Sequence, residues 1–459
     1  MFYRADFILQ GHDWIEDGAL EVQDDQILQV GPAEDLIDPS DAPDVTDLGH
    51  VALVPGQVNA HSHAFQRAIR GRTEYVSIDR QADDFWSWRE AMYEAVLSLD
   101  ADAFESACRR AFEEMALTGY TTVGEFHYVH HRPDGTPYDD PNELAYRAID
   151  AARDVGLRIS LLRVAYNRAG YDKSPNPRQR RFIESDVDTY LQRFDALTRS
   201  IEERRFVSVG MAPHSIRAVP QEWLEAISAH GHGQDVPMHI HACEQPGEVA
   251  ESMDEYGKPP LEALESMGLL DDRVTIIHGT HLSEGELGIL ADRQPTICAC
   301  PTTERNLGDG FLPATELMDR GVPICLGSDS HANIDPFEEM RLVEYHERLQ
   351  KRRRNVLASY AEPRAVATDP GGSDRLSTAE VCWEMGTRHG ARALGLPGGE
   401  LLPGRLADFT ALDLDHISLR GADAESLLPS IVFSMTPGAV RDVFVGGEAI
   451  VRDGGLTSS

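Results

Sequence analysis

Eight short apolar segments, each separated from the next by a longer stretch, place the strongest constraint on the fold of this 459-residue chain. The segments are rich in Val, Ile and Leu, and many of the intervening stretches are amphipathic and carry helix-capping residues. Continuously apolar strands that alternate with helices are typical of a parallel sheet buried on both faces. Eight such units predict a (β/α)8 TIM-type barrel, with an open doubly wound sheet as the structural alternative. The predicted strands are residues 51–58, 121–126, 157–164, 206–212, 236–241, 274–278, 295–300 and 322–327.

Two of the intervening helices have clear limits in the sequence. Asp100 can cap a helix whose apolar residues recur every three or four positions, and Gly119 can end it. Pro141 and Gly156 bracket a second helix. Both lie between predicted strands, which supports the repeating β/α pattern.

The two ends of the chain have a different pattern. Apolar and polar residues alternate in residues 1–49 and again in residues 406–455, which is typical of antiparallel strands with one buried face. The simplest arrangement is a small β-sandwich domain built from both termini, with the barrel inserted between them. We therefore predict a composite β domain of residues 1–54 and 405–459, and a catalytic α/β barrel of residues 55–404.

The charge balance excludes one class of partner. The chain has 42 Lys and Arg residues against 77 Asp and Glu residues, which gives a formal net charge of −35. A protein this acidic repels the phosphate backbone of nucleic acids and anionic membrane surfaces. We therefore expect neither a nucleic acid nor a membrane as its partner.

Cysteine usage and the first residues favour a cytoplasmic protein. The 6 cysteines lack the dense, regular spacing of a disulfide framework, which favours a reducing compartment. Acidic residues near the start replace the basic head of a signal peptide, and no later segment is apolar for the roughly 18 residues that cross a membrane. No C-x-x-C pair occurs, which excludes the zinc-dependent base deaminases of the H-x-E fold.

Histidine and aspartate residues mark the carboxyl ends of several predicted strands. His61 and His63 follow the first strand, and side chains two residues apart in an extended segment point the same way. His241, His278 and Asp329 close the fifth, sixth and eighth strands. Active sites of such barrels lie at this end of the strands, so we expect these side chains to converge. Imidazoles and a carboxylate suit Zn²⁺ with one position open for water, and the predicted ligands are His61, His63, His241 and Asp329.

A single cation is expected. A second cation in a barrel of this kind usually needs a bridging carboxylated lysine in the fourth strand. That strand, FVSVGMAPHSI, contains no lysine, and Lys173, Lys258 and Lys351 lie away from the predicted strand ends. We therefore predict one zinc ion per subunit.

Three side chains are candidates for moving protons at this centre. Glu244 follows His241 by three residues and can deliver a proton to a substrate nitrogen. Asp329 can accept a proton from the attacking water, and His278 can hydrogen-bond that water or the developing charge. His281 competes with His278 for the last role, but we favour His278 because it ends the predicted strand.

The segments VPGQVNAHSHAFQR, HIHACEQ, IIHGTH and GSDSH together resemble the mononuclear aminohydrolase branch of the amidohydrolase superfamily, over nearly the whole chain. Within that branch the chain is similar to the formimidoylglutamate deiminases. The segments that carry this closer resemblance are HSHAFQRAIRGRTE, FWSWREAMY, GEFHYVHH, APHSIRAV and CPTTERNLGDG.

The resemblance implies a reaction and a set of roles. N-formimino-L-glutamate and water would give N-formyl-L-glutamate and ammonia, a step of bacterial histidine degradation. The resemblance implies zinc on the four predicted ligands, Glu244 as proton shuttle, His278 beside the hydrolytic water, and a homodimer. It also implies substrate contacts from Gln66, Tyr128, His214 and Arg217.

A small-molecule dicarboxylate substrate needs local positive charge in a protein this acidic. Arg217 follows the fourth predicted strand, where it could bind a carboxylate through two hydrogen bonds. Arg89, within the aromatic segment FWSWR, could bind the second carboxylate or could instead cover an aromatic cluster on a helix surface.

Two other functions stay open. An aminohydrolase of a purine or another heterocycle would use the same ligands, but it needs a stacking pocket more than paired cations. A non-catalytic barrel that serves as a binding scaffold should have lost ligands, and none is missing. Arg305 stands where the resemblance leads us to expect a small residue, which leaves open whether it touches the substrate.

Overall fold

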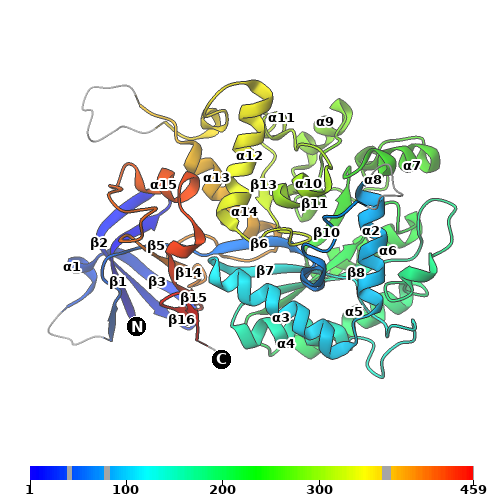
Figure 1. The fold of residues 1–459 in the computed structure, drawn as a ribbon, viewed down its shortest axis with the longest axis horizontal. Helices are drawn as coiled ribbons and strands as arrows, with labels where there is room; N and C mark the ends of the chain where they lie inside the picture. Colours follow the sequence, from blue (N-terminus) through cyan, green and yellow to red (C-terminus); the bar gives the residue numbers. More distant parts are fainter. Residues whose placement is uncertain (39–43, 77–82, 364–373, 458–459) are drawn as a thin grey trace.

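The computed structural model describes residues 1–38, 44–76, 83–363 and 374–457. In these residues eight parallel strands form one sheet in unbroken chain order, β6 to β13, which curls into a nearly closed barrel (Figure 1). This order confirms the (β/α)8 barrel, because a doubly wound sheet reverses its strand order at a switch point. The barrel strands are β6 (Gln57–Ser62), β7 (Tyr120–His127), β8 (Arg158–Ala165), β9 (Val207–Pro213), β10 (Met238–Ala242), β11 (Val274–His278), β12 (Thr296–Ala299) and β13 (Ile324–Leu326).

Helices surround the barrel, and the two with predicted limits are found. Asp100 caps α3, and its side chain accepts a hydrogen bond from the Ala103 N–H at 2.8 Å. Gly156 ends α4 with a φ of 95°, which favours glycine. The helices of the barrel region are α2 (Phe85–Leu97), α3 (Ala101–Leu117), α4 (Glu143–Val155), α5 (Val187–Ile201), α6 (Gln221–Gln234), α7 (Pro246–Tyr256), α8 (Pro260–Ser266), α9 (Glu284–Arg293), α10 (Pro301–Leu307), α11 (Ala314–Met318), α12 (Pro336–Lys351), α13 (Thr378–Gly386) and α14 (Arg388–Ala393).

The first predicted strand, residues 51–58, is wrong in its limits. The structure divides this apolar run into β5 (Val51–Pro55), which belongs to the terminal sheet, and β6, which opens the barrel. Gly56 lies at the division, where a Cβ atom would fall 2.2 Å from the Thr121 side chain. Both halves are fully buried, including the polar Gln57 that begins β6, so burial does not mark the change of sheet. His61 consequently lies inside β6 rather than after a strand.

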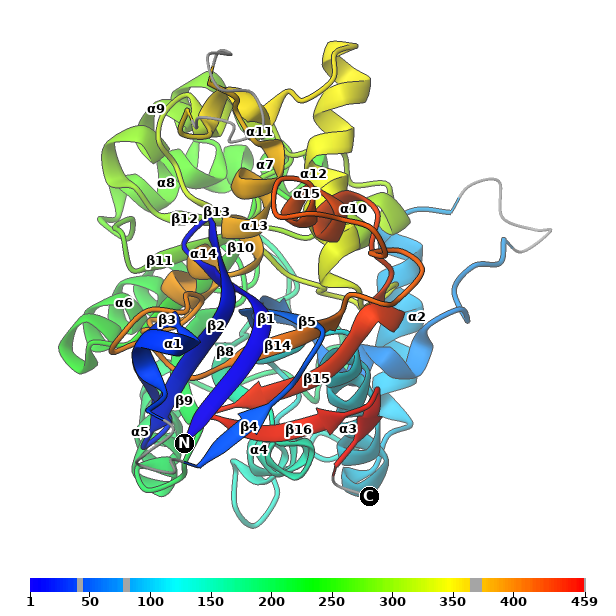
Figure 2. The same cartoon turned by 90° about the vertical axis from the view of Figure 1, so that its left-hand side faces the viewer.

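Strands from both termini form a second, mixed sheet of nine strands (Figure 2). Most neighbours in it are antiparallel, as expected, but β1 pairs in parallel with both β4 and β5. The limits of the two domains stay a prediction. Besides β5, the strands are β1 (Phe2–Gln10), β2 (Asp13–Gln23), β3 (Gln26–Pro32), β4 (Val45–Asp47), β14 (Phe409–Asp413), β15 (Val440–Val445), β16 (Glu448–Arg452) and β17 (Gly455–Leu456), and helices α1 (Ala33–Leu36) and α15 (Leu427–Phe433) accompany them in the terminal parts of the chain.

A buried ion pair joins the sheet to the barrel. Arg158, the first residue of β8, donates to Asp408 through Nε at 2.8 Å and through Nη2 at 3.0 Å. Asp408 also accepts from the backbone N–H of Gly446 in the terminal sheet region. The Arg158 and Asp408 charges are therefore paired with each other, and Asp408 has a further hydrogen bond. A buried ion pair is tolerated only when its groups are satisfied in this way.

No helix among the described residues has the length and apolar character needed to span a membrane.

The barrel closes where β13 meets β6. The Asp329 N–H donates to the His61 carbonyl at 3.0 Å, and the His63 N–H donates to the Asp329 carbonyl at 3.0 Å. Gly327 permits this approach, because a Cβ atom there would lie 2.9 Å from the His61 carbonyl oxygen and 2.7 Å from its Cβ.

Replacing Gly327 by Ala should push β13 away from β6. We expect a loss of about 1–3 kcal/mol in the free energy of unfolding, the usual cost of overpacking, together with weaker metal binding through His61. Chemical denaturation and metal titration would measure the two effects. Gly288→Ala in α9 is the matched control, because no atom lies within 4 Å of the added Cβ. Equal stability of the two variants would contradict this account of the closure.

Candidate metal centre and active site

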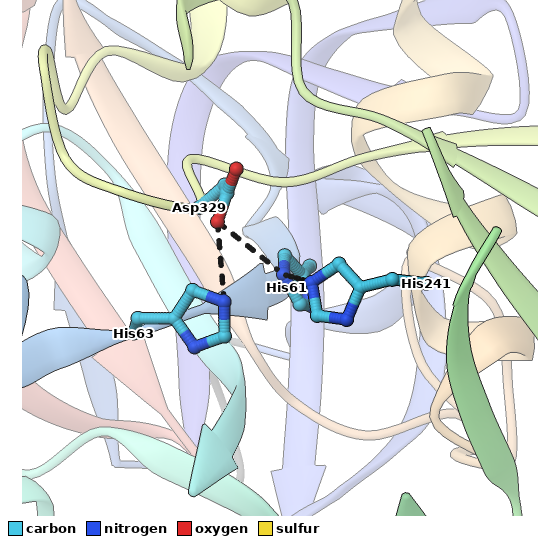
Figure 3. Close-up of side chains that lie close together, drawn as sticks. All are labelled: His61, His63, His241 and Asp329. Carbon is cyan, nitrogen blue, oxygen red and sulfur yellow. Dashed lines mark hydrogen bonds and ion pairs between the residues drawn. The ribbon is translucent and has the colours of Figure 1, made fainter. Parts of the chain in front are cut away.

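Four side chains converge at the closure of the barrel. They are His61 in β6, His63 directly after it, His241 in β10 and Asp329 after β13 (Figure 3). The Oδ1 atom of Asp329 lies 3.4 Å from His61 Nε2 and 3.3 Å from His63 Nε2. His241 Nε2 lies 3.2 Å from His61 Nε2. All four residues are buried, and their ligand atoms lie within 4.8 Å of one another.

The backbone fixes which ring nitrogen faces this centre. His63 Nδ1 donates to the Phe126 carbonyl at 3.1 Å, and His241 Nδ1 donates to the His214 carbonyl at 3.0 Å. Each ring therefore turns its Nε2 lone pair inward, as in most histidine metal sites. Burial lowers the pKa of all three imidazoles, which keeps them neutral. Converging neutral nitrogens with a carboxylate oxygen fit a borderline divalent cation, so this is a metal site of the predicted composition.

The candidate proton-transfer groups lie beside this centre. His278, the last residue of β11, places Nε2 3.7 Å from Glu244 Oε1 and 3.9 Å from Asp329 Oδ2. His281, the competing candidate, instead donates from Nε2 to the Asp309 carbonyl at 2.7 Å. The geometry therefore favours His278 over His281 for a contact with the reacting atoms.

Strained backbone occurs at the ends of the strands that carry these groups. Cys243, His278 and Asp329 have φ angles of 57°, 73° and 49°, a region that non-glycine residues seldom occupy. Such strain is common at active sites, where the surrounding structure holds a side chain in a direction that a regular strand would not give. His278 and Asp329 line the cavity, whereas the Cys243 thiol donates to Glu286 outside it.

Glu304 is a functional candidate that the sequence analysis missed. Its Oε1 atom lies 3.4 Å from His278 Nδ1 and accepts a hydrogen bond from the Cys300 N–H at 2.9 Å. Burial opposes a charge on His278, but Glu244, Glu304 and Asp329 outweigh it and raise its pKa to about 10. Glu304 lies within CPTTERNLGDG, where nothing in the sequence distinguishes it from the other charged residues, Arg305 and Asp309.

The sequence analysis also missed a buried group of hydrogen-bonded side chains, centred on Glu125, that holds the segment carrying His61 and His63. Glu125 accepts hydrogen bonds from the Ser62 hydroxyl at 2.6 Å and from the Ala64 N–H at 2.9 Å, so it braces the chain on both sides of His63. Burial raises the pKa of Glu125 to about 8. His331 completes the group through Ser62 and Ser328. The sequence contains no spacing signal for the contacts of Glu125 and of Ser62 with His331, because they join residues far apart in the chain.

A cavity over the metal site brings the predicted substrate residues together. It is lined by α2 and by the strand ends, and Gln66 Nε2 donates to the Tyr128 hydroxyl at 2.7 Å inside it. His214 packs its ring against His241 at 4.9 Å between centroids. Of the residues predicted for the site, those that line the cavity are His63, Gln66, Arg89, Tyr128, His214, Arg217, His241, Glu244, His278 and Asp329, whereas His61 lies deeper.

Two arginines in this cavity lie within electrostatic range of Glu244 but make no direct ion pair with a described carboxylate. Arg217 is buried, and its Nη1 atom donates to the Ala169 carbonyl at 3.4 Å. Arg89 lies over the Trp86 ring at 4.4 Å, and its Nε and Nη1 atoms are buried without a hydrogen-bond partner. No carboxylate of the described residues forms an ion pair with either guanidinium. Their donors are therefore available to an anionic ligand.

Arg305, whose contact was left open, points away from this cavity. Its Nη1 atom pairs with Glu338 at 3.0 Å, and nearly half of its side chain is exposed. A larger residue at this position is therefore accommodated at the surface of α10.

The chain is similar in sequence to known hydrolases of one family. Residues 52–450 match the model of the amidohydrolase family, and the chain belongs to that family. It is 38% identical over 404 residues, 88% of this chain and 85% of the relative, to the formimidoylglutamate deiminase of Pseudomonas aeruginosa.

Solved structures show the same fold. An amidohydrolase from Brucella melitensis has a TM-score of 0.87 at 33% identity, with 99% of this chain and 96% of that chain covered. An adenosine deaminase from Xanthomonas campestris with bound zinc has a TM-score of 0.79 at 23% identity, with 100% and 94% covered.

Removing the carboxylate that holds His278 should impair catalysis without loss of the metal. For Glu304→Gln we expect unchanged metal content and a fall in turnover of roughly 10–100-fold, the range for an outer partner that orients a working histidine. Steady-state kinetics and metal analysis would measure both quantities. Glu338→Gln is the control, because this residue pairs with Arg305 near the surface. Wild-type turnover in Glu304→Gln would show that His278 needs no such support.

Proposed function

We propose that this protein is a zinc-dependent formimidoylglutamate deiminase, which hydrolyses N-formimino-L-glutamate to N-formyl-L-glutamate and ammonia. The observation that carries the proposal is a pair of arginines, Arg89 and Arg217, that make no direct ion pair with a described carboxylate and lie in the cavity over a His-His-His-Asp site. In a linear amidine with two carboxylates, the carboxylates would bind the arginines and the amidine carbon would lie at the metal site. The 38% identity to a formimidoylglutamate deiminase supports the same substrate.

The overall charge makes these arginines informative. The chain carries a formal charge of −35, so an anionic substrate is repelled by most of the surface. Two guanidinium groups that make no direct ion pair with a described carboxylate create a local exception, although the charge of Glu244 acts on both. A guanidinium matches a carboxylate through two parallel hydrogen bonds, so each arginine can take one carboxylate of the substrate. Gln66, Tyr128 and His214 are positioned to take the remaining polar atoms of the substrate.

The chemistry divides among a few side chains. Zinc held by His61, His63, His241 and Asp329 would lower the pKa of a water and polarise the formimino group. Asp329 takes a proton from the attacking water. Glu244 carries a proton to the substrate nitrogen, and burial, which raises the pKa of this carboxyl, favours that role. His278, held by Glu304, hydrogen-bonds the attacking oxygen as charge develops.

A deaminase of a purine or another heterocycle is the second candidate. Aromatic side chains of the same cavity favour it, because a ring substrate could stack on them. They are Phe85, Trp88, Tyr93, Tyr128, Tyr166 and Phe182. The adenosine deaminase of the same fold shows that the architecture admits such substrates in other proteins. The two arginines favour the dicarboxylate substrate over a purine.

A homodimeric assembly stays a prediction.

Ammonia release distinguishes these candidates. We expect the zinc-loaded protein to release ammonia rapidly from N-formimino-L-glutamate, slowly from N-formimino-glycine, which lacks the second carboxylate, and not from guanine or adenosine. A chelator should abolish the activity. Release from a purine alone would replace the proposed substrate, and zinc binding without any turnover would leave only the fold and the metal site.

Arg217→Gln tests carboxylate recognition within the same assay. Loss of a charge-assisted pair costs about 1.5–3 kcal/mol, so kcat/KM for N-formimino-L-glutamate should fall by about 10–150-fold. A matched control is Arg305→Gln, whose guanidinium points away from the cavity. Equal kcat/KM in Arg217→Gln and the wild type would exclude this arginine from substrate binding.

Glu244→Gln tests the proton shuttle. The variant should bind zinc with the wild-type stoichiometry and lose at least about 100-fold in kcat, because general acid–base catalysis contributes about 10²–10⁴-fold. Asp254→Asn, on the exposed face of α7, is the control and should behave as the wild type. The assignment is wrong if Glu244→Gln retains wild-type activity.

A further inference from the structure

Asp329 presents its two carboxylate oxygens to two different groups of donors. Oδ1 faces His61 and His63 at 3.4 Å and 3.3 Å. Oδ2 faces His278 Nε2 at 3.9 Å. A carboxylate placed in this way can bridge two cations, which is a common arrangement in two-metal hydrolases.

A second donor set lies on the Oδ2 side of Asp329. His278, Cys300 and Asp329 are all buried, and they offer one ligand atom each within 4.8 Å of one another. Cys300 lies directly after β12, at the start of α10, and is fully buried. Glu244 Oε1 lies 3.7 Å from His278 Nε2, beside this set of three but not within it. Imidazole, thiolate and carboxylates are the ligands of thiophilic divalent ions such as Zn²⁺ and Cd²⁺.

The charge around these donors favours an additional cation. Four carboxylates, those of Glu244, Glu304, Asp309 and Asp329, act electrostatically on His278 or one another. Burial and, next, the charge of Glu244 raise the pKa of the Asp309 carboxyl to about 9. A divalent ion among these carboxylates would relieve that repulsion.

We propose that His278, Cys300 and Asp329, beside Glu244, form a second divalent-cation site that is inhibitory. Such a site would need no bridging lysine, because Asp329 could share its two oxygens between the cations and Cys300 could supply a thiolate. Binding replaces the thiol proton and any proton on the inward ring nitrogen, and both protons pass to solvent. Occupancy removes His278 and Glu244 from their proposed roles, so this inhibition rests on the proposed function, but the site itself does not.

The consequence is a biphasic response to zinc. The first equivalent should activate the protein, and a second should reduce ammonia release by at least about 10-fold, because groups that orient water and move protons are then bound. Mg²⁺, which prefers oxygen ligands and keeps its waters, should not inhibit.

The test is a titration of the zinc-loaded protein with Cd²⁺, read by the ultraviolet charge-transfer band of a cadmium–thiolate bond and by metal analysis after dialysis. Three proteins are compared: the wild type, Cys300→Ala, and Cys298→Ala. Cys298 is the matched control, because it is buried two residues away in the same apolar cluster. Ammonia release is followed in parallel, relative to each protein's own activity with one equivalent of zinc.

The expected result is a second bound equivalent with a thiolate band and loss of activity in the wild type and Cys298→Ala, and none of these in Cys300→Ala. A second equivalent without a thiolate band, which would indicate surface carboxylates, overturns the proposal, as does a band that Cys298→Ala removes. If Cys300→Ala does not fold, joint appearance of the band and the inhibition in the wild type decides the question. Absence of deiminase activity would refute the proposed function and leave the spectroscopic answer intact.

Discussion

The closure of the barrel is the constraint on which the site depends. Asp329 and the His61–His63 segment exchange backbone hydrogen bonds at 3.0 Å, and the side chains of these same residues form the metal site. The last strand therefore cannot separate from the first without loss of the ligand geometry. A bound cation would tie the two strands together in turn, so metal affinity and stability of the closed barrel are linked.

The cavity contains both carboxylate and guanidinium groups, and they can serve different functions. Carboxylates gather on the side of His278, where Glu244, Glu304 and Asp329 approach its ring. The guanidinium groups of Arg89 and Arg217 line the same cavity without a direct ion pair to a described carboxylate, although the charge of Glu244 acts on both. The groups around His278 can thus handle protons and cations, while the arginines can hold anionic groups of a substrate.

Prediction from the sequence was most accurate where residue type and strand position coincide. Histidines at strand ends and an aspartate after the eighth strand located the metal centre, because the carboxyl ends of parallel strands must meet. Glu304 and Glu125 were missed because their partners come from other strands, and no local spacing encodes a contact across the barrel. The break at Gly56 was missed because both flanking strands are equally buried.

The sequence by itself determined the barrel, the mixed origin of the terminal sheet and the residue types at the metal centre, because apolar periodicity and chain order suffice for these. Tertiary structure alone decided that Asp329 turns its two oxygens to different donors, that Cys300 lies beside His278, and that Arg305 points outward. Such facts depend on side-chain direction at the strand ends. Left-handed backbone angles at His278 and Asp329 set those directions, and tertiary packing holds them against their intrinsic cost.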